Sequence, residues 1–155
     1  MKSLPWLAPA QHTLRASLAA DRVPHALLVH EDPGAGGLEL AHWTSQLLLC
    51  RDRDRAPCGA CPDCRWVEDR QHPDCLLVHS ESKSGQIVVD QIRAAVAELR
   101  LTGHSGRAKI AIMAPAEAIN ANGANALLKT LEEPTPSTLL MLVTSQPSQI
   151  GRAHV

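Results

Sequence analysis

Short apolar runs alternate with longer segments of mixed polarity along the chain. Four mostly apolar runs suit buried strands of a parallel sheet, because such strands lie beneath helices on both faces and need no polar side. They occupy residues 26–29, 75–78, 109–113 and 139–143.

Amphipathic segments between these runs predict helices over residues 9–20, 38–50, 88–100 and about 122–133. In the clearest of them Val88, Ile92 and Val96 recur at helical spacing and form one apolar face. Pro134 ends the last helix, because proline lacks a backbone N–H. Strands that alternate with helices predict an α/β fold, in which a parallel sheet is flanked by helices.

The composition narrows the function classes. A chain of 155 residues with 45% apolar residues supplies the core of one domain, or of one domain with a small insertion. It contains three Trp but no Phe or Tyr, so aromatic faces for stacking on bases are scarce. The net charge of -1 also argues against a broad nucleic-acid footprint. Contact with DNA inside a larger assembly remains open.

The N-terminal region predicts a cytoplasmic chain. Pro5, Pro9 and Gln11 interrupt any apolar run that would form a signal peptide. No segment approaches the roughly 20 apolar residues of a membrane span, so we expect no membrane partner. Because cytoplasmic thiols stay reduced, clustered cysteines there indicate a metal rather than disulfides.

Four cysteines follow one another with the spacing C-x7-C-x2-C-x2-C. Four thiolates suit a tetrahedral zinc ion and leave no open coordination position, so we expect a structural zinc with no catalytic role. The predicted ligands are Cys50, Cys58, Cys61 and Cys64. Cys75 falls in a predicted strand and is expected to be a buried, inert thiol. His72 is expected to lie near the cluster without binding the metal.

A zinc module of this kind also permits a nucleic-acid-binding interpretation. Four arginines lie in or beside the cysteine run, but three aspartates interleave with them and reduce the local charge. The arginines are Arg51, Arg53, Arg55 and Arg65, and the aspartates are Asp52, Asp54 and Asp63. We therefore prefer a solvated module that stiffens the domain, and keep DNA binding as the alternative.

The glycine-rich segment after the first predicted strand resembles a phosphate loop. A strand, a glycine-rich loop and a helix form the phosphate cradle of P-loop proteins. That motif needs a Lys for the phosphates and a Ser or Thr for magnesium, whereas Gly37 and Leu38 stand at those positions. Glu31 and Asp32 precede the loop and would repel a triphosphate. The degenerate loop comprises Pro33, Gly34, Gly36, Gly37 and Leu38.

The end of the third predicted strand is degraded as well. P-loop ATPases place a magnesium-binding Asp there, followed by a catalytic Glu, but this chain has Ala114 and Pro115. Glu117 comes too late for either role, and we expect it to begin the following helix. Two broken motifs predict a chain without catalytic residues and without a functional ATP site.

Several segments together resemble bacterial clamp-loader subunits of DNA polymerase III, which have the AAA+ fold. The most specific is Asn-Ala-Leu-Leu-Lys-Thr-Leu-Glu-Glu-Pro at residues 125–134. His-Ala-Leu-Leu at 25–28, the four-cysteine insert and Val-Asp-Gln-Ile-Arg at 89–93 match in the same order. The resemblance covers residues 3 to about 149. The degraded loop places the chain with the delta-prime subunits rather than the gamma/tau motors, which keep their Lys-Thr and Asp-Glu motifs.

The resemblance implies a stator in a ring that opens the sliding clamp and places it on primed DNA. The implied partners are the gamma/tau and delta subunits, together with the sliding clamp and primer-template DNA through the assembled complex. The family's Ser-Arg-Cys arginine finger would follow the fourth strand, and Arg152 does not lie in that context. Thr144 would be a vestigial γ-phosphate sensor. Lys129, Glu132 and Glu133 are either part of an intersubunit surface or an ordinary exposed helix end.

The expected organisation is one AAA+-like domain over residues 1–149, with the zinc module inserted at about 50–66. The lid and collar domains of the family are not represented, so we expect an N-terminal fragment. Residues 150–155 resemble translated adapter sequence and are expected not to be native, with a genuine C-terminus as the alternative. Two alternative functions remain: an ATP-hydrolysing gamma/tau-type subunit and a zinc-dependent nucleic-acid-binding module.

Overall fold

The computed structural model describes residues 4–101 and 103–146. The expected non-native segment 150–155 and Arg152 therefore lie outside the described residues. In chain order the elements are η1 (Pro5–Leu7), α1 (Ala8–Ala19), β1 (Ala26–His30), α2 (Gly37–Leu49), α3 (Pro62–Glu68), β2 (Cys75–Val78), α4 (Val89–Leu99), β3 (Lys109–Met113), η2 (Ala116–Ala118), α5 (Ala121–Glu132) and β4 (Thr138–Thr144).

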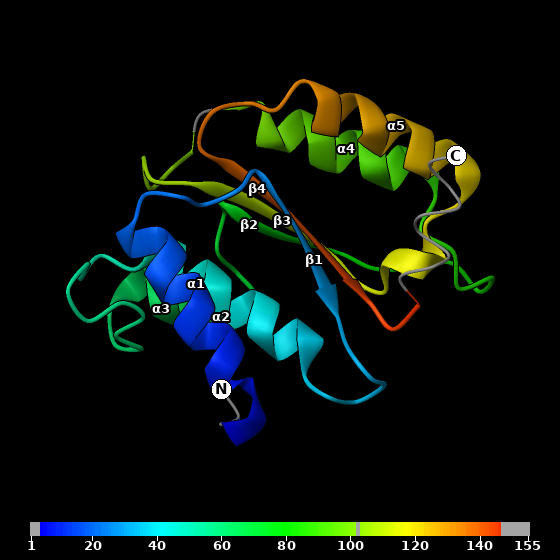
Figure 1. Ribbon diagram of the computed structural model, residues 1–155. Helices are drawn as coiled ribbons and strands as arrows, with labels where there is room; N and C mark the ends of the chain where they lie inside the picture. Colours follow the sequence, from blue (N-terminus) through cyan, green and yellow to red (C-terminus); the bar gives the residue numbers. More distant parts are fainter. Residues whose placement is uncertain (1–3, 102, 147–155) are drawn as a thin grey trace.

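The four strands form one parallel sheet between two helical layers. The strand order is β1-β4-β3-β2. Figure 1 shows α4 and α5 over one face of the sheet and α1, α2 and α3 over the other. This arrangement confirms the α/β fold, with a helix-flanked parallel sheet, that the sequence predicts.

Alternate residues of the two central strands supply the two halves of the core. On β3, Ile110 and Ile112 pack toward α2, whereas Ala111 and Met113 belong to the cluster beneath α4 and α5. All five residues of β3 are buried. The strands are therefore almost uniformly apolar, because both of their faces are covered.

The predicted elements match the observed ones to within one or two residues, with two differences. The short helix α3 was not predicted, because three of its seven residues are Pro, Cys and Trp in a cysteine-rich run. The prediction for Glu117 was wrong: it lies in η2, separate from α5. The side chain of Asn120 caps α5 by accepting from the N–H of Gly123 at 2.8 Å, so this helix begins at Ala121, one residue before the predicted start.

Within residues 4–101 and 103–146, the helices are too short and too polar for any of them to cross a membrane.

Candidate metal centre and the degenerate phosphate loop

The four predicted zinc ligands converge at one end of α2. Their sulfur atoms all lie within 4.8 Å of one another. Cys50 follows the last turn of α2, Cys58 lies in the connecting loop, and Cys61 and Cys64 begin α3. A tetrahedral zinc with Zn–S bonds of about 2.3 Å holds its sulfurs about 3.8 Å apart, so the cluster needs only a small contraction.

Backbone N–H groups point at the cysteine sulfurs. Ala60 and Cys61 donate to Cys58 Sγ at 3.4 and 3.2 Å, and Cys64 donates to Cys61 Sγ at 3.4 Å. The first two bonds lower the pKa of the Cys58 thiol to about 6, whereas burial raises the pKa of Cys64. Thiolates must form for metal to bind, and a buried thiolate needs a cation beside it. The donor set therefore fits a closed, structural zinc site.

A buried carboxylate ties the cysteine module to the rest of the domain. Asp63, which lies between two of the cysteines, accepts from Arg51 Nε at 2.5 Å and from His72 Nε2 at 2.8 Å. Burial alone would raise the pKa of Asp63, but these hydrogen bonds lower it. His72 Nδ1 accepts from the N–H of Asp74 at 2.9 Å, which places the ring proton on Nε2. His72 thus bridges the module to the residue that precedes β2.

Two arginines bind the carboxyl end of α2. Arg107 Nη1 donates to the carbonyl of Leu49 at 3.2 Å and lies 3.5 Å from Asp63 Oδ2, so it joins the start of β3 to the module. Arg53 Nη1 donates to the carbonyl of Leu48 at 3.1 Å, with longer bonds to two neighbouring carbonyls. Both guanidinium groups cap carbonyls that the helix leaves unpaired.

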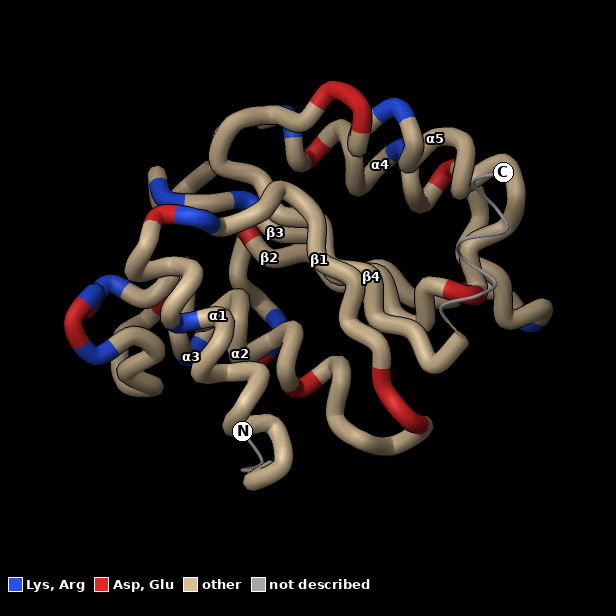
Figure 2. The backbone as a smooth tube through the Cα atoms, in the orientation of Figure 1, with Lys and Arg blue, Asp and Glu red and all other residues tan. Residues whose placement is uncertain are grey.

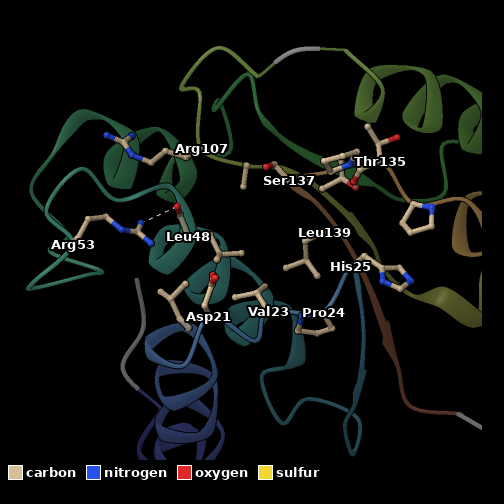
Figure 3. Close-up of a pocket in the computed structure, with 15 residues that line it drawn as sticks. Asp21, Val23, Pro24, His25, Leu48, Arg53, Arg107, Thr135, Ser137 and Leu139 are labelled. Carbon is tan, nitrogen blue, oxygen red and sulfur yellow. Dashed lines mark hydrogen bonds between the residues drawn. The ribbon is translucent and has the colours of Figure 1, made fainter.

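Figure 3 shows both arginines at the edge of an open pocket of about 770 Å³ near the amino ends of the strands. The Arg53–Leu48 bond is drawn there as a dashed line. At this edge of the pocket the Nη1 atoms of both arginines are directed to the carbonyls at the end of α2.

The charges of the module largely pair within it. Figure 2 shows basic and acidic positions alternating along the loop that precedes α3. Arg55 Nε donates to Asp52 Oδ2 at 2.7 Å, and Arg51 binds Asp63. This internal pairing supports a self-contained structural module more than a DNA-binding face.

The phosphate loop keeps its turn shape. Gly34 and Gly36 have φ values of 81° and 96°, in the left-handed region that glycine adopts without strain. Ala35 N–H donates to the carbonyl of Asp32 at 2.9 Å, which closes the turn, and Gly36 then leads directly into α2. The backbone therefore has the strand–turn–helix form that the sequence predicts.

The lysine position of this loop is filled by another part of the chain. The N–H of Gly37 donates to the carboxylate of Glu31. A Cβ atom on Gly37 would lie 2.7 Å from the Glu31 carboxyl carbon and 2.9 Å from Val143 Cγ1. On the outer side, Trp6 Nε1 donates to the carbonyl of Ala35 at 2.6 Å. The loop is closed from inside by a carboxylate and from outside by the N-terminal segment.

A second carboxylate occupies the neighbouring strand end. Glu117 accepts from Thr144 Oγ1 at 2.6 Å and from Ser145 Oγ at 3.1 Å. Burial opposes the ionisation of Glu117, but the two hydroxyls outweigh it and lower the pKa of this carboxyl. Thr144, the expected vestigial sensor, is thus bound within the chain.

Sequence reasoning missed the roles of both carboxylates. The signal for Glu31 was present: an acid stands at the end of a strand, six residues before a glycine that replaces a lysine. Nothing comparable marks Glu117, which is 27 residues away from Thr144 along the chain.

A third feature lies between α4 and α5, on the outer side of the domain. An open groove of about 680 Å³ there is lined by Arg93, Arg100 and Lys129, and by the amides of Asn122 and Asn125. Among the described residues that line it, none is acidic. Lys129, Glu132 and Glu133 are all exposed, in agreement with both interpretations of that helix end.

Comparisons with known proteins give a consistent result. Residues 7–152 match the family model described as DNA polymerase III, delta subunit. The chain is 41% identical over 127 residues to a DNA polymerase III subunit delta' of Pseudomonas aeruginosa, and 35% identical over 151 residues to that of Escherichia coli. These alignments cover 81% and 97% of this chain but only 39% and 45% of the relatives. The chain thus spans less than half of their length.

Two further matches are more distant. A DNA polymerase III subunit tau of Salmonella typhimurium is 28% identical over 144 residues, which cover 90% of this chain and 22% of the relative. The crystal structure of a DNA polymerase III, gamma subunit-related protein from Thermotoga maritima matches with a TM-score of 0.58 at 20% identity. It covers 89% of this chain and 40% of that protein, and it supports the fold alone.

Proposed function

The chain belongs to the DNA polymerase III delta-subunit family, as a homologue of its delta-prime members, and we propose that it acts as the non-catalytic stator of a clamp loader. In this role it helps to load the sliding clamp onto primed DNA, together with gamma/tau and delta subunits, in the cytoplasm. Residues 1–149 supply the AAA+-like domain of that stator, and the zinc module is an insertion at about 50–66.

The observation that carries the proposal is the state of the phosphate loop. Gly37 offers no cationic side chain, and its N–H binds Glu31 instead of a phosphate oxygen. Phosphoryl transfer depends on cations that neutralise the developing charge, and a carboxylate at this place has the opposite effect. A subunit of this kind keeps one shape through the ATPase cycle of its neighbours, which is what a stator requires.

The proposed zinc ion stiffens this rigid unit. Cys50, Cys58, Cys61 and Cys64 would hold it, and the metal would supply a fourfold cross-link between the end of α2, the following loop and the start of α3. The chain's own residues complete the cross-link, because Asp63 binds Arg51, His72 and Arg107 around it.

The groove between α4 and α5 supports contact with primer-template DNA in the assembled complex. Arg93, Arg100 and Lys129 line it, and Asp90, which does not line the groove, lies 3.9 Å from Arg93 Nη1. Three cations along one groove suit a phosphate backbone and carry no sequence information. The low net charge and the absence of Phe and Tyr fit an auxiliary contact rather than independent DNA binding.

Titration calorimetry with ATP and magnesium on the zinc-loaded protein tests the proposal. We expect no detectable heat, whereas a gamma/tau subunit measured alongside should bind. Micromolar binding by this chain would contradict the stator proposal and favour the ATP-hydrolysing alternative. Co-purification of a full-length version with gamma/tau and delta subunits tests the partners, and a version that never enters the complex would contradict them.

A further inference from the structure

We propose that Glu31 is an internal ligand of the degenerate phosphate loop: its carboxylate takes the place of a phosphate and keeps the loop folded without nucleotide. This inference rests on the proposed function and deepens it, because it gives the physical reason why the site stays inert. Loss of the lysine alone would leave a weak anion site, whereas a tethered carboxylate leaves none.

The first support is the position of the carboxylate. Glu31 follows β1 directly, and its N–H donates to the carbonyl of Thr144 at 2.9 Å, so its backbone is anchored on the sheet. Its side chain then reaches the N–H of Gly37, the first residue of α2. Free N–H groups and the helix dipole make this end of a helix attractive to anions. Figure 2 shows the acidic positions that follow β1 on this loop.

The second support is the space around Gly37. This glycine is the first residue of α2 and does not have the positive φ of Gly34 or Gly36, so the backbone conformation does not require glycine here. The space beside it is limited by Glu31, whose carboxyl carbon and Oε2 would lie 2.7 and 2.8 Å from a Cβ atom, and by Val143, whose Cγ1 would lie 2.9 Å from it. Any side chain at this position would therefore require the Glu31 carboxylate to move away from the N–H of Gly37.

The third support is that polar groups around the loop are also hydrogen-bonded to side chains of the same chain. The hydroxyl of Thr144, at the end of the adjacent strand, donates to a carboxylate, that of Glu117. The carbonyl of Ala35 accepts from the indole of Trp6, which covers the loop on its outer side. The start of α2 and the end of β4 are thus each bound by an acid of the chain itself.

The proposal predicts which substitution would make the loop accessible to an anion. We expect that replacing Gly37 by lysine would not by itself restore phosphate binding, because the Glu31 carboxylate stays on the same loop and competes with a phosphate for the N–H groups and for the new cation. Removing the Glu31 side chain, in contrast, leaves the N–H of Gly37 without its carboxylate acceptor, so an added anion can bind there.

The experiment measures thermal unfolding of the zinc-loaded protein while inorganic pyrophosphate is titrated. It compares the wild type with Glu31→Ala, with Glu31→Gln and with Asp32→Asn as the matched control. Asp32 is the adjacent acid, is exposed, and contributes its backbone carbonyl to the turn. Glu31→Gln keeps the size and one acceptor of Glu31 and therefore serves if Glu31→Ala does not fold.

We expect Glu31→Ala to unfold roughly 2–4 °C or more below the wild type without added anion, and millimolar pyrophosphate to recover much of this loss. Glu31→Gln should show a smaller loss and a smaller recovery. The wild type and Asp32→Asn should not respond to pyrophosphate. Both Glu31 variants behaving like Asp32→Asn, in stability and in anion response, would overturn the proposal.

The result separates this inference from the proposed function. A wild type that binds ATP and magnesium would overturn both, because the loop would then accept phosphate despite Glu31. A wild type that binds neither ATP nor pyrophosphate, with Glu31 variants that also bind neither and are equally stable, would overturn the inference alone.

Discussion

The cysteine module and the phosphate loop lie at opposite ends of the same helix, and they differ in where their ligand comes from. The module gathers four thiols, which repel one another once ionised, so it needs a cation from outside the chain. The loop gathers N–H donors at a helix start, and the chain supplies the anion through Glu31. The shape of a binding site therefore does not by itself show that a ligand binds there. A charge that the chain leaves unpaired inside the site is the better indicator.

Removal of the metal should break the module and produce the largest effect. Cys64→Ser takes away one thiolate of a buried cluster, and zinc binding in small modules contributes on the order of 10 kcal/mol to folding. We expect this variant to lose zinc and to unfold at a much lower temperature, as measured by metal analysis and circular dichroism.

Cys75→Ala is the matched control for that variant. Cys75 lies on β2, and burial raises the pKa of its thiol to about 11, so it should remain a protonated thiol outside the cluster. The variant should keep its zinc. Equal zinc loss in both variants would contradict the assignment of the four ligands.

Removing the carboxylate of Asp63 should destabilise the module without emptying it. Asp63→Asn leaves Arg51, His72 and Arg107 around a neutral amide, and breaking a buried charge network costs about 3–5 kcal/mol. Chemical denaturation should show this loss, while metal analysis should still find zinc. Full loss of zinc would mean that Asp63 matters for metal binding itself.

A methyl group at the loop should give a smaller loss that depends on Glu31. Gly37→Ala places a carbon against the Glu31 carboxylate and Val143, and overpacking of this kind costs about 1–3 kcal/mol. The same change in a Glu31→Ala background should cost less, because one of the two contacts is gone. A double-mutant cycle measures the difference. Equal costs in both backgrounds would mean that Val143 alone limits the space.

The smallest effect should appear as a pH dependence at Asp74. Burial opposes its ionisation, but the N–H groups of Ser105 and His104, at 2.7 and 2.8 Å, lower the pKa of this carboxyl. A lowered folded-state pKa adds stability above the unfolded value of about 3.9, and this stability is lost as the pH falls through the folded value.

Asp74→Asn should therefore cost about 1–3 kcal/mol at neutral pH and little in acid. Urea unfolding at both pH values measures this, with the exposed Asp90→Asn as the control. A cost for Asp74→Asn that does not change with pH would show that its charge is not the cause.

The sequence predicted the positions of the helices and strands better than the side-chain contacts at the phosphate loop and the end of β4. Strand positions followed from short apolar runs and helix positions from apolar periodicity, and β3 and β4 are buried along almost their whole length. Helix α3 was not predicted, because a cysteine stands where an apolar residue would mark its buried face. Its sequence signal is only a proline that follows the N-cap residue Cys61. The hydrogen bonds of Glu31 and Glu117 were not predicted, because they depend on the direction of each side chain in the folded structure. The spacing of residues along the sequence does not determine that direction.

Helix α2 itself has a consequence for how the domain opens. Its 13 residues form a rod about 20 Å long, with the loop at one end and Cys50 at the other, and most of it is buried. Segments that are packed this continuously tend to exchange their amide hydrogens as one cooperative unit. Chelation at the cysteines should therefore speed deuterium uptake in the first turn of α2, a full helix length from the metal.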